Sequence, residues 1–276
     1  MALLTLTSDI GNRDYLVAAV KAQLYSINAD FRIIDISHQV PPFNYPQTAY
    51  LCRSAIHFFP TYSYHIILVN LFEKKPEQLL LAFHKNQYYL CADNGLLPMI
   101  LEEKPELVMG ISVPYTSEPV TTRLTQLMGE TVNKLVNGAP IQSIGVADIN
   151  YEAKNPLKPF PIENGIEGHI IFIDNFENVV INITREYFEE QRRGRNFKIV
   201  FKRNEQIEKI SNSYADVDEG HKLALFNSAG YLELAINKGN AAGLFGLKGY
   251  SEKQQISGII QNQLYYQTIR VYFEGN

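Results

Sequence analysis

Polar side chains follow several predicted strands at the points where small ligands bind in α/β proteins. Asp9 comes directly after the apolar strand that we expect at Leu3–Ser8, and Gly11 follows it closely. In a parallel sheet this is the carboxyl edge, where a carboxylate can accept hydrogen bonds from both hydroxyls of a ribose. A turn or capping aspartate is at least as compatible with the position, so Asp9 alone does not define a site.

A second polar loop, from Asp174 to Asn178, lies between two β-branched strands in the second half of the chain. An Asp174 carboxylate could hold an ammonium group, and an Asn178 amide could read the edge of a purine. A plain hairpin loop explains the same residues, so this segment also allows two interpretations.

Two aromatic residues and one small polar turn complete the candidates. Phe43 follows the rigid pair Pro41-Pro42, and Tyr214 lies in the polar stretch Ser213–Val217. An aromatic ring on a loop can stack on a base or can fill a core. Ser228 lies between two predicted strands, in a turn that supplies small polar groups and flexible backbone.

Several common kinds of site are not indicated. The sequence contains no phosphate-binding P-loop, no GxGxxG, no HExxH and no GxSxG. The six histidines do not cluster at metal-ligand spacing. Cys52 and Cys91 are isolated in apolar segments and are interpreted as buried free thiols. We therefore expect neither a metal nor a cofactor.

Composition limits the partners. The net charge of -4 gives no electrostatic reason to expect nucleic acid or a membrane surface. No run approaches the roughly 20 apolar residues of a membrane helix, and the first eight residues read as a strand. We expect a cytoplasmic protein whose partner is a small molecule.

The pattern of elements predicts two domains. The first half alternates strands and helices, which indicates a mostly parallel sheet covered on both faces. After a proline-rich stretch, short strands follow one another closely, as in a small barrel or sandwich. We expect an α/β domain at residues 1–150, a linker at 151–165 and an all-β domain at 166–276. A two-domain chain often binds its ligand at the domain junction.

Taken in order, short segments spread over nearly the whole chain resemble one family. The family is the S-adenosylmethionine hydroxide adenosyltransferases, which are related to the bacterial fluorinase and chlorinase. The matching segments are Leu6–Gly11, Ile34–His38, Ala92–Leu97, Ile173–Asn178 with Asn182-Ile183, Tyr214–Val217, Asn227–Ala235 and Gly239–Ala242.

The resemblance implies an N-terminal Rossmann-like α/β domain, a C-terminal β-barrel and a homotrimer with its ligand between subunits. It implies S-adenosylmethionine as substrate or ligand, with no separate cofactor. Asp9 would hold the ribose hydroxyls, and Phe43 would lie beside the sugar and the sulfonium. Asn178 and Tyr214 would serve the adenine. Asp174 and Ser228 would hold the amino-acid end.

The chain departs from the family where the attacking water is positioned by an aspartate, an arginine and a histidine. The aspartate position is Asn70, and Glu77 stands where the arginine is expected. The histidine belongs near Tyr115–Arg123, yet no histidine occurs from Gly95 to Gly168. The halogenase pattern, with tyrosine at the position of Asn70, is not restored either. Glu73 or Glu118 could supply a substitute carboxylate.

Three hypotheses remain. The chain could cleave S-adenosylmethionine by attack at the ribose C5′, slowly, to give adenosine and methionine. It could be a catalytically degenerate protein that binds or senses an adenosyl ligand. It could also use a different nucleophile, since the segment around Asn70 is rebuilt.

Overall fold

The computed structural model describes residues 1–114, 121–202, 205–247 and 267–274. The chain divides into two compact units, Met1–Pro156 and Leu157–Asn276, and each is described by itself.

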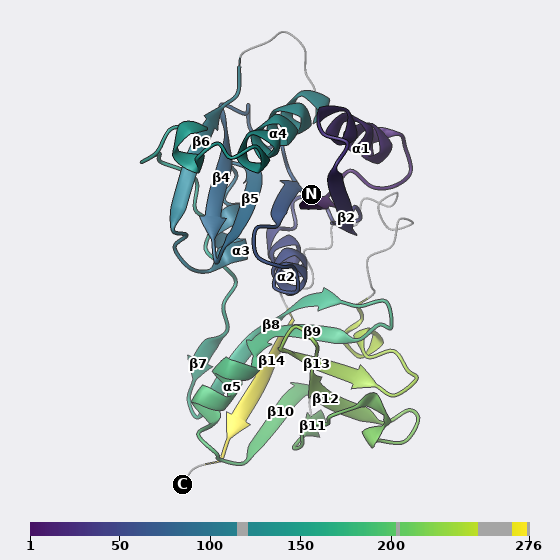
Figure 1. The fold of residues 1–276 in the computed structure, drawn as a ribbon. Coiled ribbons are helices and arrows are strands. Elements are labelled where there is room, and N and C mark those ends of the chain that lie inside the picture. Colours follow the sequence, from purple (N-terminus) through teal and green to yellow (C-terminus); the bar gives the residue numbers. More distant parts are fainter. Residues whose placement is uncertain (115–120, 203–204, 248–266, 275–276) are drawn as a thin grey trace. The chain divides into compact units, whose positions relative to one another are not determined.

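The first unit is built on a sheet with strand order β2-β1-β3-β5-β4-β6 (Figure 1). The strands are β1 (Ala2–Ser8), β2 (Phe31–Ser37), β3 (Tyr64–Leu68), β4 (Gln78–His84), β5 (Gln87–Ala92) and β6 (Leu107–Ser112). β1 pairs in parallel with β2 and β3, and β3 with β5. The pairs β4–β5 and β4–β6 are antiparallel. The carboxyl ends of β1 and β3 therefore meet at one edge.

Helices cover both faces of this sheet. α1 (Leu16–Ile27) and α4 (Thr121–Val136) pack on one face through Val20, Leu24 and Met128. α2 (Tyr45–Ile56) and α3 (Leu96–Leu101) pack on the other through Cys52 and the apolar residues of α3. Burial on both faces explains why every residue of β3 is buried and why its sequence shows no polar alternation.

The second unit is an antiparallel sheet around one core. Within the described residues the strand order is β11-β10-β14-β8-β9-β13-β12, with β7 added to β8. The strands are β7 (Phe160–Ile162), β8 (Gly165–Ile173), β9 (Val179–Thr184), β10 (Phe197–Lys202), β11 (Glu205–Ile207), β12 (Lys222–Phe226), β13 (Tyr231–Ile236) and β14 (Thr268–Phe273). A bridge between Ile210 and Ala224 joins the chain after β11 to β12, so the sheet nearly closes into a barrel. The predicted fold class, an α/β unit followed by an all-β barrel, is confirmed.

Several elements are not predicted by the sequence patterns, among them α3, β6, the helix α5 (Arg185–Arg192) and the short strands β7 and β11. The first sheet is mostly parallel, as expected, and β4 joins both its neighbours antiparallel because the hairpin β4–β5 reverses the chain direction within the sheet.

Residues 149–154, which we call the strap, lie against the first unit. Ile149 and Tyr151 pack on the core beside α2 and α3. The Glu152 amide donates to Asp93 Oδ1 at 2.7 Å. The stem of Lys154 covers Gly95, where an added Cβ would lie 2.5 Å from Lys154 Cγ. The strap therefore extends the first unit up to Pro156.

Candidate functional site

Asp9 and Asn70 meet at the carboxyl edge of β1 and β3. The backbone N–H of Asn70 donates to Asp9 Oδ2 at 2.9 Å, and the backbone N–H of Asp9 donates to the Leu68 carbonyl at 3.4 Å. Burial raises the pKa of Asp9, while the backbone N–H groups of Asn70 and of Asp9 itself oppose that rise. One carboxylate oxygen is thus fixed by backbone at an edge where ligands bind.

Phe43 is bonded through its backbone to the side chain of Asn70. Its amide donates to Asn70 Oδ1 at 3.0 Å, and its own φ of 59° is in the left-handed region. The side chain is 68% exposed, so the ring is not part of a core in this unit. Of the two interpretations of Phe43, the loop aromatic with a free face fits this geometry.

Asn70 is hydrogen-bonded to Asp9, Phe43 and Asn94. The bond from Phe43 uses Oδ1 and fixes the orientation of the amide. The Asn94 amide group donates to the carbonyls of Val69 and Asn70 at 3.0 and 3.2 Å, which holds the backbone of Asn70 at a φ of 49°. The Asn70 Nδ2 is buried, with no hydrogen-bond acceptor in range among the described residues. Asn70 therefore organises the loop, and its side-chain oxygen already accepts one backbone hydrogen bond.

A cavity of about 510 Å³ opens beside Asn70. Its lining is Asn70, Leu71, Glu73, Lys74, Lys75, Pro76, Glu77, Gln78, Ala92, Asp93, Asn94 and Ser112. Glu77 thus faces the space beside Asn70, so it places a negative charge where the resemblance expects a positive one. Asp93 serves a structural purpose, because it accepts from Gln78 Nε2 at 2.7 Å and from the strap.

Three side chains of the first unit form a network that was not predicted. The Tyr45 hydroxyl donates to Glu73 Oε2, and Lys154 Nζ lies 3.0 and 3.1 Å from the two Glu73 oxygens. The same ammonium lies 3.8 Å from the centre of the Tyr45 ring. Glu73 was considered as a substitute carboxylate, but Tyr45 and Lys154 gave no signal in the sequence. Glu118, the other candidate, and part of the segment expected to hold the histidine lie outside the described residues.

In the second unit, Asp174 and Asn178 are bonded to each other. Asp174 Oδ1 accepts from the amides of Phe176 and Asn178 at 2.9 and 2.8 Å, and its Oδ2 accepts from Asn178 Nδ2 at 2.9 Å. The carboxylate therefore shapes its own loop. This geometry fits the hairpin interpretation. A ligand bound here would have to share Asp174 oxygens that already accept hydrogen bonds within the loop.

Tyr214 lies over a buried glutamate. Its hydroxyl donates to Glu233 Oε1 at 2.7 Å, and Glu233 on β13 is only 3% exposed. Burial raises the pKa of Glu233 and the charge of Asp174 adds to the rise, while hydrogen bonds from Tyr214 and Asn227 oppose it. Asp174, Tyr214 and Glu233 are therefore neighbours. The available signal for Glu233 was a single charge within the apolar strand Tyr231–Ile236.

Ser228 is exposed in the turn before β13. The predicted residues thus form two groups, Asp9 with Phe43 and Asn70 in the first unit, and Asp174 with Asn178 and Tyr214 in the second.

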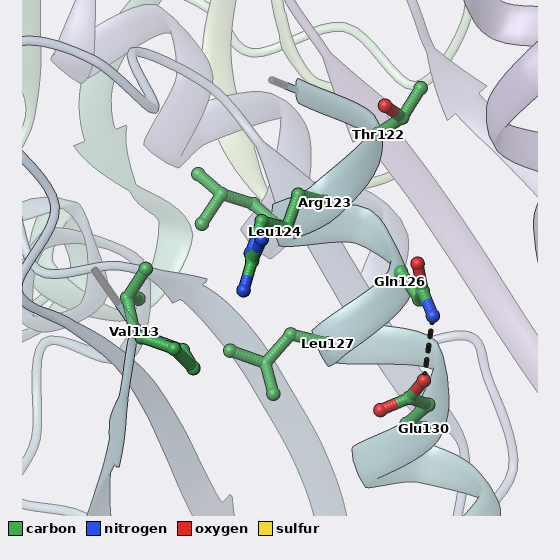
Figure 2. A pocket seen from close by; sticks show the side chains of 8 residues that line it. Val113, Thr122, Arg123, Leu124, Gln126, Leu127 and Glu130 are labelled. Carbon is green, nitrogen blue, oxygen red and sulfur yellow. Dashed lines mark hydrogen bonds between the residues drawn. The ribbon is translucent and has the colours of Figure 1, made fainter. Parts of the chain in front are cut away.

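A second cavity, of about 380 Å³, lies between the end of β6 and the first turns of α4. Figure 2 shows Arg123 and Leu127 on the side facing Val113, while Gln126 donates to Glu130 at 2.9 Å.

Neither a metal site nor a membrane span is found in the described ranges. No group of three or more histidine, cysteine, aspartate or glutamate side chains there could hold a metal ion. No helix in the same ranges has the length and apolar character needed to cross a membrane.

The chain thus combines an α/β sheet that has a carboxylate at its parallel carboxyl edge with an antiparallel, nearly closed barrel. Comparison with family models gives the family. Residues 4–145 match the SAM hydroxide adenosyltransferase N-terminal domain, and residues 168–253 match the C-terminal domain. The chain belongs to the SAM hydroxide adenosyltransferase family.

Curated relatives carry two kinds of name. The chain is 28% identical to an (R)-S-adenosyl-L-methionine hydrolase of Methanocaldococcus jannaschii, over 89% of this chain and 92% of that protein. It is 25% identical to a fluorinase of Actinopolyspora mzabensis, over 89% and 94%. An uncharacterized conserved protein of Thermotoga maritima has the same fold, with a TM-score of 0.79 at 23% identity over 98% and 99% of the two chains.

Proposed function

We propose that this chain binds S-adenosylmethionine and cleaves it slowly by attack of water at the ribose C5′, giving adenosine and methionine. Membership of the family supports the substrate. The observation that carries the proposal is the Asp9 carboxylate, held by the Asn70 amide at the carboxyl edge with the Phe43 ring exposed beside it.

The chemistry asks little of the protein beyond positioning. The sulfonium already carries a positive charge, so methionine leaves as a neutral thioether and needs no acid. The protein must hold the ribose, bring the nucleophile into line and remove its water shell. Asp9 would accept the ribose hydroxyls, and Phe43 would cover the sugar and sulfonium. Asn178 and Tyr214 would bind the adenine, with Asp174 and Ser228 at the amino-acid end.

Slow turnover follows from the residues around the nucleophile. An amide oxygen takes no proton at neutral pH, and Asn70 Oδ1 already accepts a hydrogen bond from the backbone N–H of Phe43. Glu77 places negative charge on the cavity beside it. Loss of a positioned proton acceptor typically costs about 10²–10⁴-fold in rate.

The test is direct. The purified protein is incubated with S-adenosylmethionine, and adenosine is followed by chromatography against time. We expect release above the blank but well below about 1 s⁻¹, an ordinary enzyme rate. Turnover at or above that rate would contradict the assignment of Asn70 and Glu77.

A second candidate is a protein that binds the adenosyl ligand without cleaving it. The replaced positions, Asn70 and Glu77, favour it. Calorimetric binding of S-adenosylmethionine together with no adenosine after prolonged incubation would identify this function.

A further inference from the structure

The Tyr45–Glu73–Lys154 network is built next to the site and is not explained by packing. Tyr45 opens α2 and is only 8% exposed, yet its hydroxyl is bonded to a carboxylate. Glu73 comes from the rebuilt loop after β3, and Lys154 comes from the strap. Three separate segments therefore place their polar groups at one point.

This point adjoins Asn70. The Glu73 amide donates to the Asn70 carbonyl at 3.3 Å, and both residues line the same cavity. The Asn70 side chain, whose Oδ1 accepts from the Phe43 backbone amide, is also a neighbour of the Tyr45 hydroxyl, because it opposes the rise in the pKa of Tyr45. Through Asn70, the network is one residue from the Asp9 carboxylate.

We propose that Tyr45 and Glu73 form a replacement proton path for the attacking water, an inference that rests on the proposed function. The bond from the water oxygen to C5′ forms as the C5′–S bond breaks, and the electron pair of that bond leaves on methionine sulfur. The proton that water loses passes to the Tyr45 oxygen as the Tyr45 hydroxyl proton passes to Glu73.

The surrounding charges suit this path. Burial tends to raise the pKa of Glu73. Three groups lower it by more and hold it below its usual range: the Tyr45 hydrogen bond, the Lys154 ammonium and the nearby Lys74. Lys74 is itself paired with Glu152 at 2.7 Å. Burial and Glu73 together raise the pKa of Tyr45, opposed by Asn70, so Tyr45 stays a phenol that relays. An ionised but weakly basic acceptor accords with slow turnover.

The first experiment compares Glu73→Gln and Tyr45→Phe with the wild-type protein in two assays. Adenosine release from S-adenosylmethionine should fall by about 10²-fold in each variant, the usual effect of losing a proton acceptor. Adenosine affinity by calorimetry should stay within about twofold, which also shows that the variants fold. Glu103→Gln, at an exposed glutamate of the same unit paired with Lys85, is the matched control and should keep the wild-type rate.

The second experiment uses Lys154→Met and the pH profile of adenosine release. Glu73 must be ionised to accept a proton, so the rate falls on the acid side as Glu73 is protonated. Loss of the ammonium raises the pKa of Glu73, and the acid limb should therefore move to higher pH. Tyr45, Lys74 and Glu152 remain in place in this variant.

The outcomes separate the two proposals. Undiminished release by both Glu73→Gln and Tyr45→Phe would overturn the proton path and leave the proposed function intact. An unmoved acid limb in Lys154→Met would also overturn it. No release by the wild-type protein would refute the proposed cleavage, and the proton path with it.

Discussion

Substitution of Asp9 tests the proposed ligand site most directly. Its Oδ2 accepts the Asn70 amide, and under the proposed function the carboxylate also accepts ribose hydroxyls. Asp9→Ala should weaken adenosine binding by about 1.5–3 kcal/mol, the scale of hydrogen bonds to a charged group. Isothermal calorimetry measures the change. Asp9→Asn keeps an acceptor oxygen and should lose less; unchanged affinity in Asp9→Ala would place the ribose elsewhere.

Glu233 predicts a pH effect on stability. Burial raises its pKa above the ordinary 4.5, so the folded state holds the proton more tightly than the unfolded state does. Its contribution is therefore present below that ordinary value and is lost as pH rises through the folded pKa. The free energy of unfolding of the wild-type protein, relative to Glu233→Gln, should therefore decline as pH rises above 4.5.

Urea unfolding at several pH values measures this difference. Glu190→Gln, at an exposed position on α5, is the control and should give no comparable trend. A difference between wild-type and Glu233→Gln that is flat with pH would show that Glu233 is not held in a proton-binding environment.

At the scale of elements, β3 is buried along its whole length and includes one imidazole. His65 is fully buried, with Nδ1 at 2.8 Å from Thr5 Oγ1. Burial lowers its pKa from 6.5 to about 3, partly opposed by Gln87, so the unfolded chain binds its proton first. Stability should therefore fall as pH drops from 6.5 towards about 3. His65→Gln should show a shallower acid slope in urea unfolding; an equal slope would contradict this.

The elements were largely predictable, and the exceptions have a physical cause. β1, β3 and the longer strands of the barrel are apolar or alternating runs, which the sequence displays directly, whereas the three-residue strands β7 and β11 are not predicted. α3 is not predicted because nearly all of Leu96–Leu101 is apolar and buried, so the segment has no polar face to reveal a helical period.

The candidate site was predictable only in part. Asp9 and Asn70 follow neighbouring parallel strands, so their meeting follows from the order of elements. The contacts of Tyr45 with Glu73 and Lys154, and of Tyr214 with Glu233, join residues far apart in the chain. No local pattern reports such contacts, because they arise only once the chain has folded.

At the scale of the whole molecule, the family resemblance leads us to propose a homotrimer. The first sheet ends in the edge strand β2, where Ile34 is 45% exposed, and free strand edges invite pairing or cover. A cyclic trimer would provide such cover through closed heterologous contacts. Light scattering at micromolar concentration should give three times the mass of the chain. A monomer there would contradict the prediction.

The strap has a consequence for exchanging domains between relatives. The N-terminal family match ends at residue 145, but Glu152 and Lys154 lie beyond it and reach back to Asp93 and Glu73. A chimaera joined at residue 145 would bring in a foreign strap and leave Glu73 without its ammonium partner. Joined after Pro156, the same chimaera would keep every described contact of Glu73 within one parent. The point at which the two halves can be exchanged is therefore set by an ion pair that joins Glu73, inside the matched segment, to Lys154, beyond its end.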